Sequence, residues 1–196
     1  MSKTPAPPTA PSARSRILDA AESRLLKHGP TGLVLDAVAK DAEVSKGGLL
    51  YHFASKEALI EGLCERMLDG FERVQDELAL EDDREPGRWT RAYLASTVDE
   101  RGEPADASAR LMAGLLAGLG GDTSRLDAVR TRFAGWQRRL EADGVDPVEA
   151  TIVRLAADGL WLAALLGLPP LEPELRTRVL AALGRRTRPS QEDRTP

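Results

Sequence analysis

The sequence predicts an all-α fold in two parts, an N-terminal three-helix domain followed by a larger helical domain. Alternation of apolar and polar residues, the pattern of a half-buried strand, is absent, and Ala, Leu, Glu and Arg dominate. Apolar residues recur instead at steps of three and four, which is the period of an amphipathic helix. Glycine, proline and polar clusters separate these stretches, so we expect about nine helices in the 196 residues.

The N-terminal helices have clear start and stop signals. Gly29 and Pro30 end the first helix, and Ser45 is expected to be the N-cap of the third. Ser55 is expected to cap a long fourth helix. The predicted ranges are 15–28, 35–41, 46–52 and 56–80.

The larger domain contains five further predicted helices. Asp146 followed by Pro147 is a strong start signal, because aspartate caps a helix and proline suits its first position. Residues 1–13 and 185–196 lack an apolar period and are predicted to be a disordered arm and tail. The predicted helices are 88–100, 105–119, 123–142, 147–167 and 172–183, and the expected domains are 14–60 and 61–184.

Composition excludes several classes of protein. One cysteine (Cys64) and two histidines leave no basis for a disulfide framework or a thiolate-rich metal site. No catalytic triad, phosphate loop or dinucleotide fingerprint is present, so we expect no enzyme, metal or cofactor. The longest apolar run, residues 159–171, is shorter than a membrane helix, which needs about 20 residues. The N-terminus also lacks the apolar core of a secretory signal, and we expect a soluble, cytoplasmic protein.

Charge is distributed unevenly behind a formal net charge of −4. Residues 1–60 carry eight basic and six acidic residues, and all five lysines of the chain lie there. Residues 61–85 carry three arginines against ten acids. We interpret this stretch as a solvated face, with attraction of a cationic ligand as the alternative. Because phosphate contacts act over about 10 Å, only local charge matters for binding a polyanion. A nucleic-acid surface is therefore expected within the first 60 residues.

The predicted helices at 35–41 and 46–52 form a candidate helix-turn-helix, in which the second helix enters the major groove of DNA. Phe53 is expected in the core, while Tyr51 fits either the core or the exposed side. Each of the two glycines of the second helix destabilises it by about 1 kcal/mol relative to alanine. This cost is understandable if a DNA duplex must approach the backbone closely at the start of the helix. The residues left on or near the exposed side are Ser45, Lys46, Gly47, Gly48, Tyr51 and His52.

Six short motifs within residues 15–61 follow one family pattern. They are Ile17-Leu18-x-Ala20-Ala21, His28-Gly29, Val38-Ala39, Val44-Ser45-Lys46-Gly47, Leu50-Tyr51-x-Phe53 and Ser55-Lys56-Glu57-x-Leu59. With these motifs the segment resembles the DNA-binding domain of the TetR family of bacterial transcriptional regulators. The resemblance implies a homodimer that places one recognition helix per subunit on a pseudo-palindromic operator of double-stranded DNA.

The resemblance also implies roles for individual residues. Ser45, Lys46 and Gly48 would face bases or phosphates, with Gly47 beside them at the helix start. Tyr51 and His52 would hold the phosphate backbone, and Lys56 would pair with a phosphate. Lysine is a point-charge phosphate binder, and the positive end of the following helix adds to it. Three residues depart from the family pattern: Val34 replaces a capping Ser or Thr, Glu43 a turn glycine, and Leu25 an aromatic residue.

The helix at 147–167 is apolar on most of its circumference, which predicts burial on both sides. One side would face its own domain and the other a second subunit, where this family dimerises. Asp158 has Arg154 one turn earlier, so an ion pair is expected, with a ligand-binding acid as the alternative. The predicted dimer residues are Ile152, Leu155, Gly159, Leu162 and Leu166, with Val179 from the last helix.

Aromatic residues concentrate in the second domain, and several are candidates for lining an effector cavity between helices, although plain core packing is the favoured explanation for any single one. The predicted effector-binding residues are Trp89, Tyr93, Met112, Leu115, Phe133 and Trp136. The prediction for the whole chain is a dimeric regulator, of the repressor type, released from DNA by a small-molecule effector. The alternative is a helical adaptor that has lost specific DNA binding, which Val34, Glu43 and the net negative charge favour.

Overall fold

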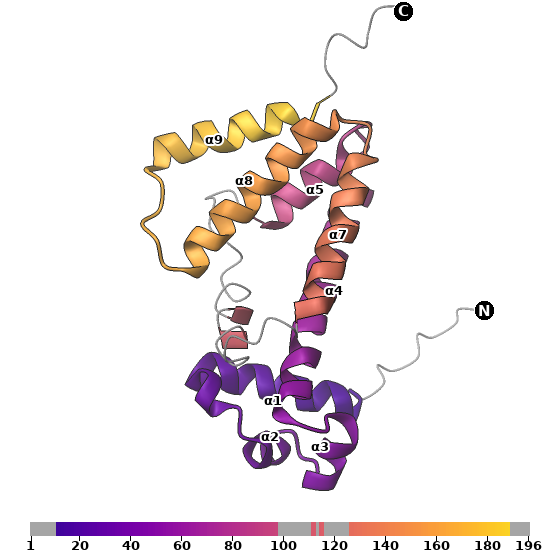
Figure 1. Cartoon of the computed structure of the whole chain (residues 1–196), viewed down its shortest axis with the longest axis vertical. Helices are drawn as coiled ribbons and strands as arrows, with labels where there is room; N and C mark the ends of the chain where they lie inside the picture. Colours follow the sequence, from indigo (N-terminus) through magenta and orange to yellow (C-terminus); the bar gives the residue numbers. More distant parts are fainter. Residues whose placement is uncertain (1–10, 98–110, 113, 116–125, 189–196) are drawn as a thin grey trace, which may run out of the picture. The chain divides into compact units, whose positions relative to one another are not determined.

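The computed structural model describes residues 11–97, 111–112, 114–115 and 126–188 (Figure 1). These residues contain eight α-helices, one 3-10 turn and no strand, which confirms the all-α prediction and lies close to the expected helix number. Most of the helix predicted at 105–119 lies outside the described residues. The chain divides into two compact units, residues 1–63 and 64–196.

The first unit contains three complete helices and the start of a fourth. Ser12 accepts a hydrogen bond from the backbone N–H of Ser15, so the first helix begins before its predicted start. The two short helices have the predicted bounds. The elements are α1 (Ala13–His28), η1 (Pro30–Gly32), α2 (Leu35–Asp41), α3 (Lys46–His52) and α4 (Lys56–Glu81), which continues into the second unit.

Apolar packing and two arginines hold the first unit together. Its core consists of fully buried side chains from all its helices, among them Ile17, Leu18, Val38, Leu49 and Leu59. Arg24 donates to the carbonyl of Gly32 at 2.8 Å and pairs with Asp41 of α2 at 2.8 Å. Arg16 donates to the carbonyl of Ala42 at the end of α2. Because these bonds fix the position of α2 on α1, they also position the helix that follows it.

The second unit continues α4 and adds α5 (Arg88–Thr97), α7 (Asp127–Glu141), α8 (Pro147–Leu165) and α9 (Pro173–Arg186). Asp146 caps α8 as predicted, accepting from the N–H groups of Val148 and Glu149. The tail was placed too early, because α9 continues to Arg186 and Thr187 is buried. The helix predicted to end at 167 ends at Leu165, followed by Gly167 with φ 64°.

The core of the second unit is built around aromatic rings. The ring of Trp136 lies 5.0 Å from those of Phe71 and Phe133, and the ring of Tyr93 lies 5.8 Å from that of Phe71. Helix α8 packs against α5, α7 and α9. Buried Asp143 caps α5 by accepting from the backbone N–H of Thr90 at 2.7 Å.

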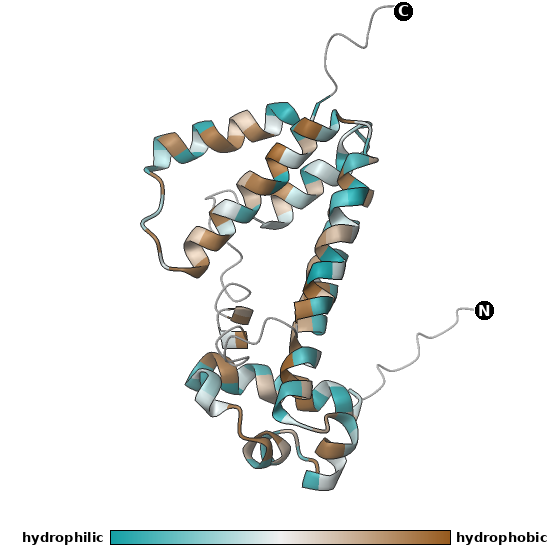
Figure 2. Ribbon diagram, viewed as in Figure 1, coloured by the Kyte–Doolittle hydropathy of each residue, from teal (hydrophilic) through white to brown (hydrophobic). Residues whose placement is uncertain are grey.

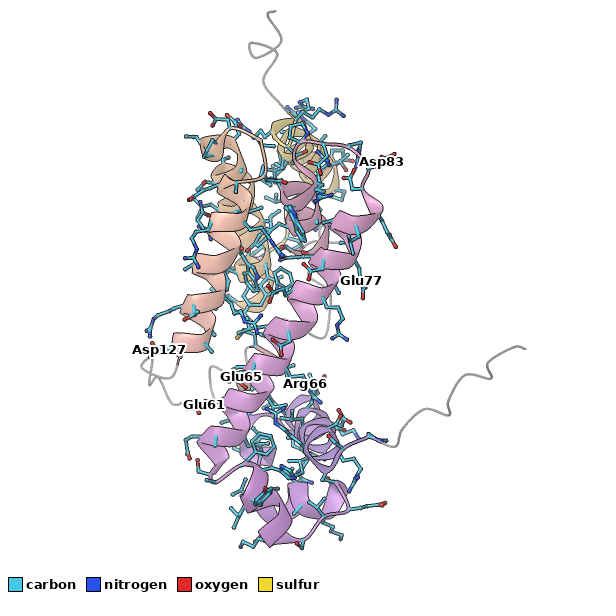
Figure 3. The ribbon with its side chains drawn as sticks, turned by 90° about the vertical axis from the view of Figure 1, so that its right-hand side faces the viewer. Glu61, Glu65, Arg66, Glu77, Asp83 and Asp127 are labelled. Carbon is cyan, nitrogen blue, oxygen red and sulfur yellow. The ribbon has the colours of Figure 1, made fainter. Side chains whose placement is uncertain are left out.

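Ion pairs join α4 to α7, which run side by side in the second unit (Figures 1 and 3). Arg132 pairs with Asp69 and Glu72, and Arg139 pairs with Asp76 at 3.0 Å. The interpretation of segment 61–85 as a solvated face was therefore incomplete, because several of its acids are neutralised within the unit. The sequence did not indicate this, since the pairing partners lie about 60 residues further along the chain.

Candidate DNA-binding surface and effector domain

Helix α3 begins with an open backbone and a complete cap. Ser45 is extended, and its hydroxyl accepts a hydrogen bond from the N–H of Gly48 at 3.0 Å, as the sequence predicted. A β-carbon added at Gly47 would have the Ser45 hydroxyl, at 4.0 Å, as its closest contact. The first turn of α3 therefore presents backbone that another molecule can approach closely.

The turn between α2 and α3 has a left-handed residue at the position where the family pattern has glycine. Glu43 has φ 53°, and no other residue with a side chain has a positive φ in the described parts of the chain. The N–H of Val44 bonds to the carbonyl of Ala39 at 3.0 Å and closes the turn. At the other end of α2, Val34 provides no side-chain cap, as the sequence predicted.

The outer side of α3 carries an exposed aromatic pair. Tyr51 is 86% exposed, and its ring contacts that of neighbouring His52 edge-on at 5.1 Å. Leu49 and Phe53 point the other way into the core, where both are buried. The alternative that Tyr51 is a core residue is thereby excluded. A phenol and an imidazole on an exposed surface can both hydrogen-bond to phosphate oxygens.

The two lysines predicted to contact DNA have partners that the sequence analysis missed. Lys46 pairs with Asp36 of α2 at 2.9 Å, with both side chains more than 60% exposed. Lys56 donates to the carbonyl of Pro30 in η1 at 3.1 Å. An ammonium group has three donors, so each lysine can still reach a phosphate. Neither partnership had a sequence signal, because each depends on how the helices pack.

The predicted effector-binding residues fall within the core of the second unit. Tyr93, Met112, Leu115 and Trp136 are buried, and Trp89 and Phe133 are half-buried. Arg139 covers the Trp89 ring, with its guanidinium carbon 3.8 Å from the ring centre. Two buried polar atoms of this unit, Trp136 Nε1 and Gln75 Nε2, have no hydrogen-bond partner in the described structure. Gln75 was missed by the sequence analysis, since a glutamine on a helix carries no pattern of its own.

A polar network links α5, α7 and α8. The Tyr93 hydroxyl donates to Asp158 at 2.6 Å, and Arg154 pairs with the same carboxylate at 2.8 Å, which confirms the predicted ion pair. Arg154 also donates to the side-chain carbonyl of Gln137. Burial raises the pKa of Asp158, and burial together with the Asp158 charge raises the pKa of Tyr93. Each carboxylate oxygen of Asp158 therefore has a hydrogen-bond partner within the unit.

An open surface pocket of about 350 Å³ lies between the end of α4 and α5. Its lining includes Asp82, Arg84 and Arg91, and none of the predicted effector-binding residues. Arg84 and Arg91 hydrogen-bond to Asp82 and hold the pKa of that carboxyl well below its usual range. Asp82 and the two arginines of this pocket are therefore already paired with one another.

The predicted dimer residues of α8 share one exposed, largely apolar face. Leu155, Leu162 and Leu166 are 56%, 48% and 63% exposed, and Ile152 lies in line with them. A β-carbon at Gly159, in the middle of this face, would have no neighbour within 4 Å. The opposite side of α8 is buried through Val153 and Ala157. Figure 2 shows hydrophobic residues along the length of this helix. The remaining predicted dimer residue, Val179 of α9, is half-buried.

Two family models match the chain in the order of its two units. Residues 17–63 match the model described as "Bacterial regulatory proteins, tetR family", and residues 87–188 match "Tetracyclin repressor-like, C-terminal domain". The chain belongs to the TetR family. This TetR-family chain is thus a transcriptional regulator with a DNA-binding helix-turn-helix and a C-terminal domain of the type that binds ligands in its relatives.

Relatives of this TetR-family regulator cover most of its length. The HTH-type transcriptional regulator RutR from Escherichia coli O157:H7 is 31% identical over 142 residues, which cover 68% of this chain and 66%, just under two thirds, of that protein. The crystal structure of a transcriptional regulator from Rhodococcus sp. Rha1 shares the fold, with a TM-score of 0.67 and 22% sequence identity. The match covers 89% of this chain and 95% of that chain. The multidrug binding protein EbrR in complex with ethidium has TM-score 0.62 and 28% identity, covering 88% of this chain and 98% of its own.

Among the residues that the structure describes, no helix has the length and apolar character that crossing a membrane requires. No group of three or more His, Cys, Asp or Glu side chains among them is arranged to hold a metal ion.

Proposed function

We propose that this TetR-family regulator is a homodimer that represses transcription from a pseudo-palindromic operator and is released by a small-molecule effector. The observation that carries the proposal is the outer surface of α3. It combines an open backbone at Gly47, a lysine at its first position and a tyrosine that is 86% exposed. A tyrosine so exposed contributes nothing to the core, which supports a role in binding.

The proposed DNA contacts follow the chemistry of each side chain. Ser45, Lys46 and Gly48 face bases or phosphates at the N-terminal end of α3. Tyr51 and His52 donate to the phosphate backbone, and Lys56 adds a charge at the start of α4.

The exposed face of α8 supports dimerisation. Its leucines expose apolar surface continuously along the helix, which is unusual for a surface helix of a monomer. A two-fold pair of these faces buries the same residues from each subunit, and Gly159 permits close approach of the helices. Two subunits would present two copies of α3 to the two halves of an operator.

The C-terminal unit is proposed to bind the effector. It has the aromatic core expected of a ligand site, and the structurally similar EbrR binds ethidium, malachite green and imidazole in its crystal structures. An effector that favours one spacing of the two α3 helices by a few kcal/mol is sufficient to switch DNA binding.

An electrophoretic mobility shift with the DNA upstream of the regulator's own gene tests the DNA-binding part. We expect a salt-sensitive, sequence-dependent shift that Tyr51→Ala weakens by at least about tenfold, since one lost phosphate or base contact costs about 1–3 kcal/mol. Leu26→Ala, at an exposed apolar residue on α1, is the matched control and should leave the shift unchanged. Binding that is insensitive to sequence and to Tyr51→Ala would instead favour an adaptor protein.

A further inference from the structure

The core of the second unit contains two buried hydrogen-bond donors that nothing in the described structure satisfies. They are the indole N–H of Trp136, whose side chain is 3% exposed, and the amide of Gln75, which is 2% exposed. Buried polar groups of folded proteins are almost always hydrogen-bonded, because leaving them unpaired destabilises the fold. An unpaired donor in a core costs stability. It is therefore expected where the sequence has been selected for binding a ligand as well as for stability.

The two donors belong to facing stretches of α4 and α7. The Trp136 ring is 5.0 Å from the ring of Phe71, and Phe71 precedes Gln75 by four residues on α4. Residues four apart on a helix share a face and are separated by about 6 Å along its axis. Arg139 of α7, about one turn after Trp136, pairs with Asp76 of α4, the residue after Gln75. The two helices are therefore in contact next to both donors. Trp136 and Gln75 therefore belong to the same stretch of the contact between α4 and α7.

The charges around the aromatic cluster argue against a cationic ligand. Asp158 is bound by Arg154 and Tyr93, Glu72 by Arg132, and Asp76 by Arg139. A cation would have to displace an arginine from one of these carboxylates. An uncharged molecule has no such cost, and it can supply the acceptor that the two donors lack.

We infer that the effector is a neutral aromatic compound with an acceptor oxygen such as a ketone, bound by hydrogen bonds from Trp136 and Gln75. The inference rests on the proposed function of the second unit as an effector domain. Half-buried Phe71, Phe133 and Met67 pack against the cluster and are the side chains that a ligand displaces, and the flexible thioether of Met67 adapts readily to such a change.

Matched pairs of probes test this chemistry on the full chain by titration calorimetry. The pairs are fluorenone and fluorene, xanthone and xanthene, and benzophenone and diphenylmethane, with ethidium as the aromatic cation. We expect at least one ketone to bind about tenfold more tightly than its methylene partner, because only the ketone accepts a hydrogen bond at that position. Gln75→Met and Trp136→Phe should each reduce this preference. Equal binding within all three pairs, no binding of any ketone, or binding of ethidium alone would overturn the inference.

A second measurement separates a ligand-binding amide from a structural one. Gln75→Met removes an unpaired buried donor and is expected to raise the melting temperature of the ligand-free protein by about 2–4 °C. Gln137→Met is the matched control, since its amide bonds to Arg154 and Thr151, and it should lower the melting temperature. If Gln75→Met also lowers the melting temperature, the amide is structural and the inference is wrong.

Gel shifts with the same proteins distinguish a failure of the ligand inference from a failure of the proposed function. A wild-type chain that shifts its upstream DNA but shows no ketone preference overturns the ligand inference alone. A chain that prefers ketones but binds no DNA contradicts the proposed function and supports the ligand chemistry.

Discussion

The helical glycines of this chain have different surroundings, and these differences separate a structural glycine from one that DNA binding would require. A β-carbon at Gly62 would lie 2.6 Å from the Phe53 ring, so packing within the first unit requires glycine there. At Gly47 the same atom would meet only open space and the Ser45 hydroxyl. Since glycine weakens a helix by about 0.5–1 kcal/mol relative to alanine, Gly47 lowers the stability of α3 without any packing reason.

We therefore predict that Gly47→Ala stabilises the protein by about 0.5–1 kcal/mol and weakens DNA binding by about 1–3 kcal/mol. The stability gain comes from helix propensity, and the binding loss comes from a methyl group between α3 and the duplex. Urea unfolding and gel shifts measure the two effects. Gly135→Ala on α7, also without a neighbour within 4 Å, should give the same stability gain with unchanged DNA binding. Undiminished DNA binding by Gly47→Ala would show that close approach of the backbone is not needed.

Asp82 makes the stability of the second unit sensitive to acid. Arg84 and Arg91 bind its carboxylate at 2.8 and 2.6 Å and lower its pKa below the usual value of 3.8. A carboxyl whose pKa is lower in the folded than in the unfolded state stabilises the fold above its unfolded pKa. That contribution is lost as the pH falls through the folded pKa.

Asp82→Asn should accordingly lower the free energy of unfolding by about 1 kcal/mol at pH 7. The difference between variant and wild type should shrink as the pH drops below about 4. Urea midpoints measured between pH 7 and pH 2.5 test this behaviour. Asp127→Asn provides the comparison, because that side chain is 84% exposed and pairs along its own helix with Arg130, so its effect should be small at every pH. A pH-independent difference for Asp82→Asn would contradict the role given to its charge.

At the scale of elements, α2 and α3 are linked by an ion pair on the proposed DNA surface. Lys46 and Asp36 lie 2.9 Å apart and are both exposed, so their pair contributes little to stability. The carboxylate nevertheless competes with phosphate for the ammonium group and adds a negative charge near the duplex.

Asp36→Asn is therefore predicted to tighten operator binding about two- to fivefold with little change in unfolding free energy. Lys46→Ala should weaken binding and make the plot of log affinity against log salt concentration shallower by about 2 for a dimer, one contact per subunit. Fluorescence anisotropy over a range of salt concentrations gives both values. Lys27→Ala, at an exposed lysine on α1, should change neither. If Asp36→Asn weakens binding, the carboxylate orients Lys46 and does not compete for it.

The elements that were predictable from the sequence are those with local signals. Ser45, Ser55 and Asp146 cap their helices as expected, and the left-handed turn at Glu43 followed from the glycine that usually stands there. The end of α9 was not predictable, since Arg185 and Arg186 have no apolar period and are helical nevertheless.

Contacts between distant segments had no signal in the sequence. The partners of Lys46 and Lys56 depend on the packing of α2 and η1 against their neighbours. The unpaired amide nitrogen of Gln75 is visible only once the helices around it are in place. Family motifs and aromatic content predicted the site residues. Neither shows whether a buried polar group has a hydrogen-bond partner.

For the whole molecule, the net charge of −4 does not conflict with DNA binding. Three acids of α4 are paired with Arg132 and Arg139 of α7, so part of the negative charge of segment 61–85 is balanced within the second unit. The five lysines all lie in the first 56 residues. DNA affinity is then expected to depend on few phosphate contacts per subunit and on joining two subunits.

Breaking the proposed dimer should abolish specific DNA binding while the subunits stay folded. Leu162→Arg places a charge on the exposed face of α8, where Leu162 is 48% exposed and contributes little to its own subunit. We expect monomers in sedimentation velocity, an unchanged circular dichroism spectrum, and operator affinity lowered by at least about 100-fold, because one subunit then meets only one half-site. Lys46 and Lys56 give two proposed phosphate contacts per subunit. The slope of log affinity against log salt concentration should therefore be about −4 for the dimer and about −2 for the monomer. Leu80→Arg, which alters a leucine that is 80% exposed at the end of α4, should remain dimeric with full affinity. Leu162→Arg protein that sediments as a dimer would exclude this face of α8 as the interface.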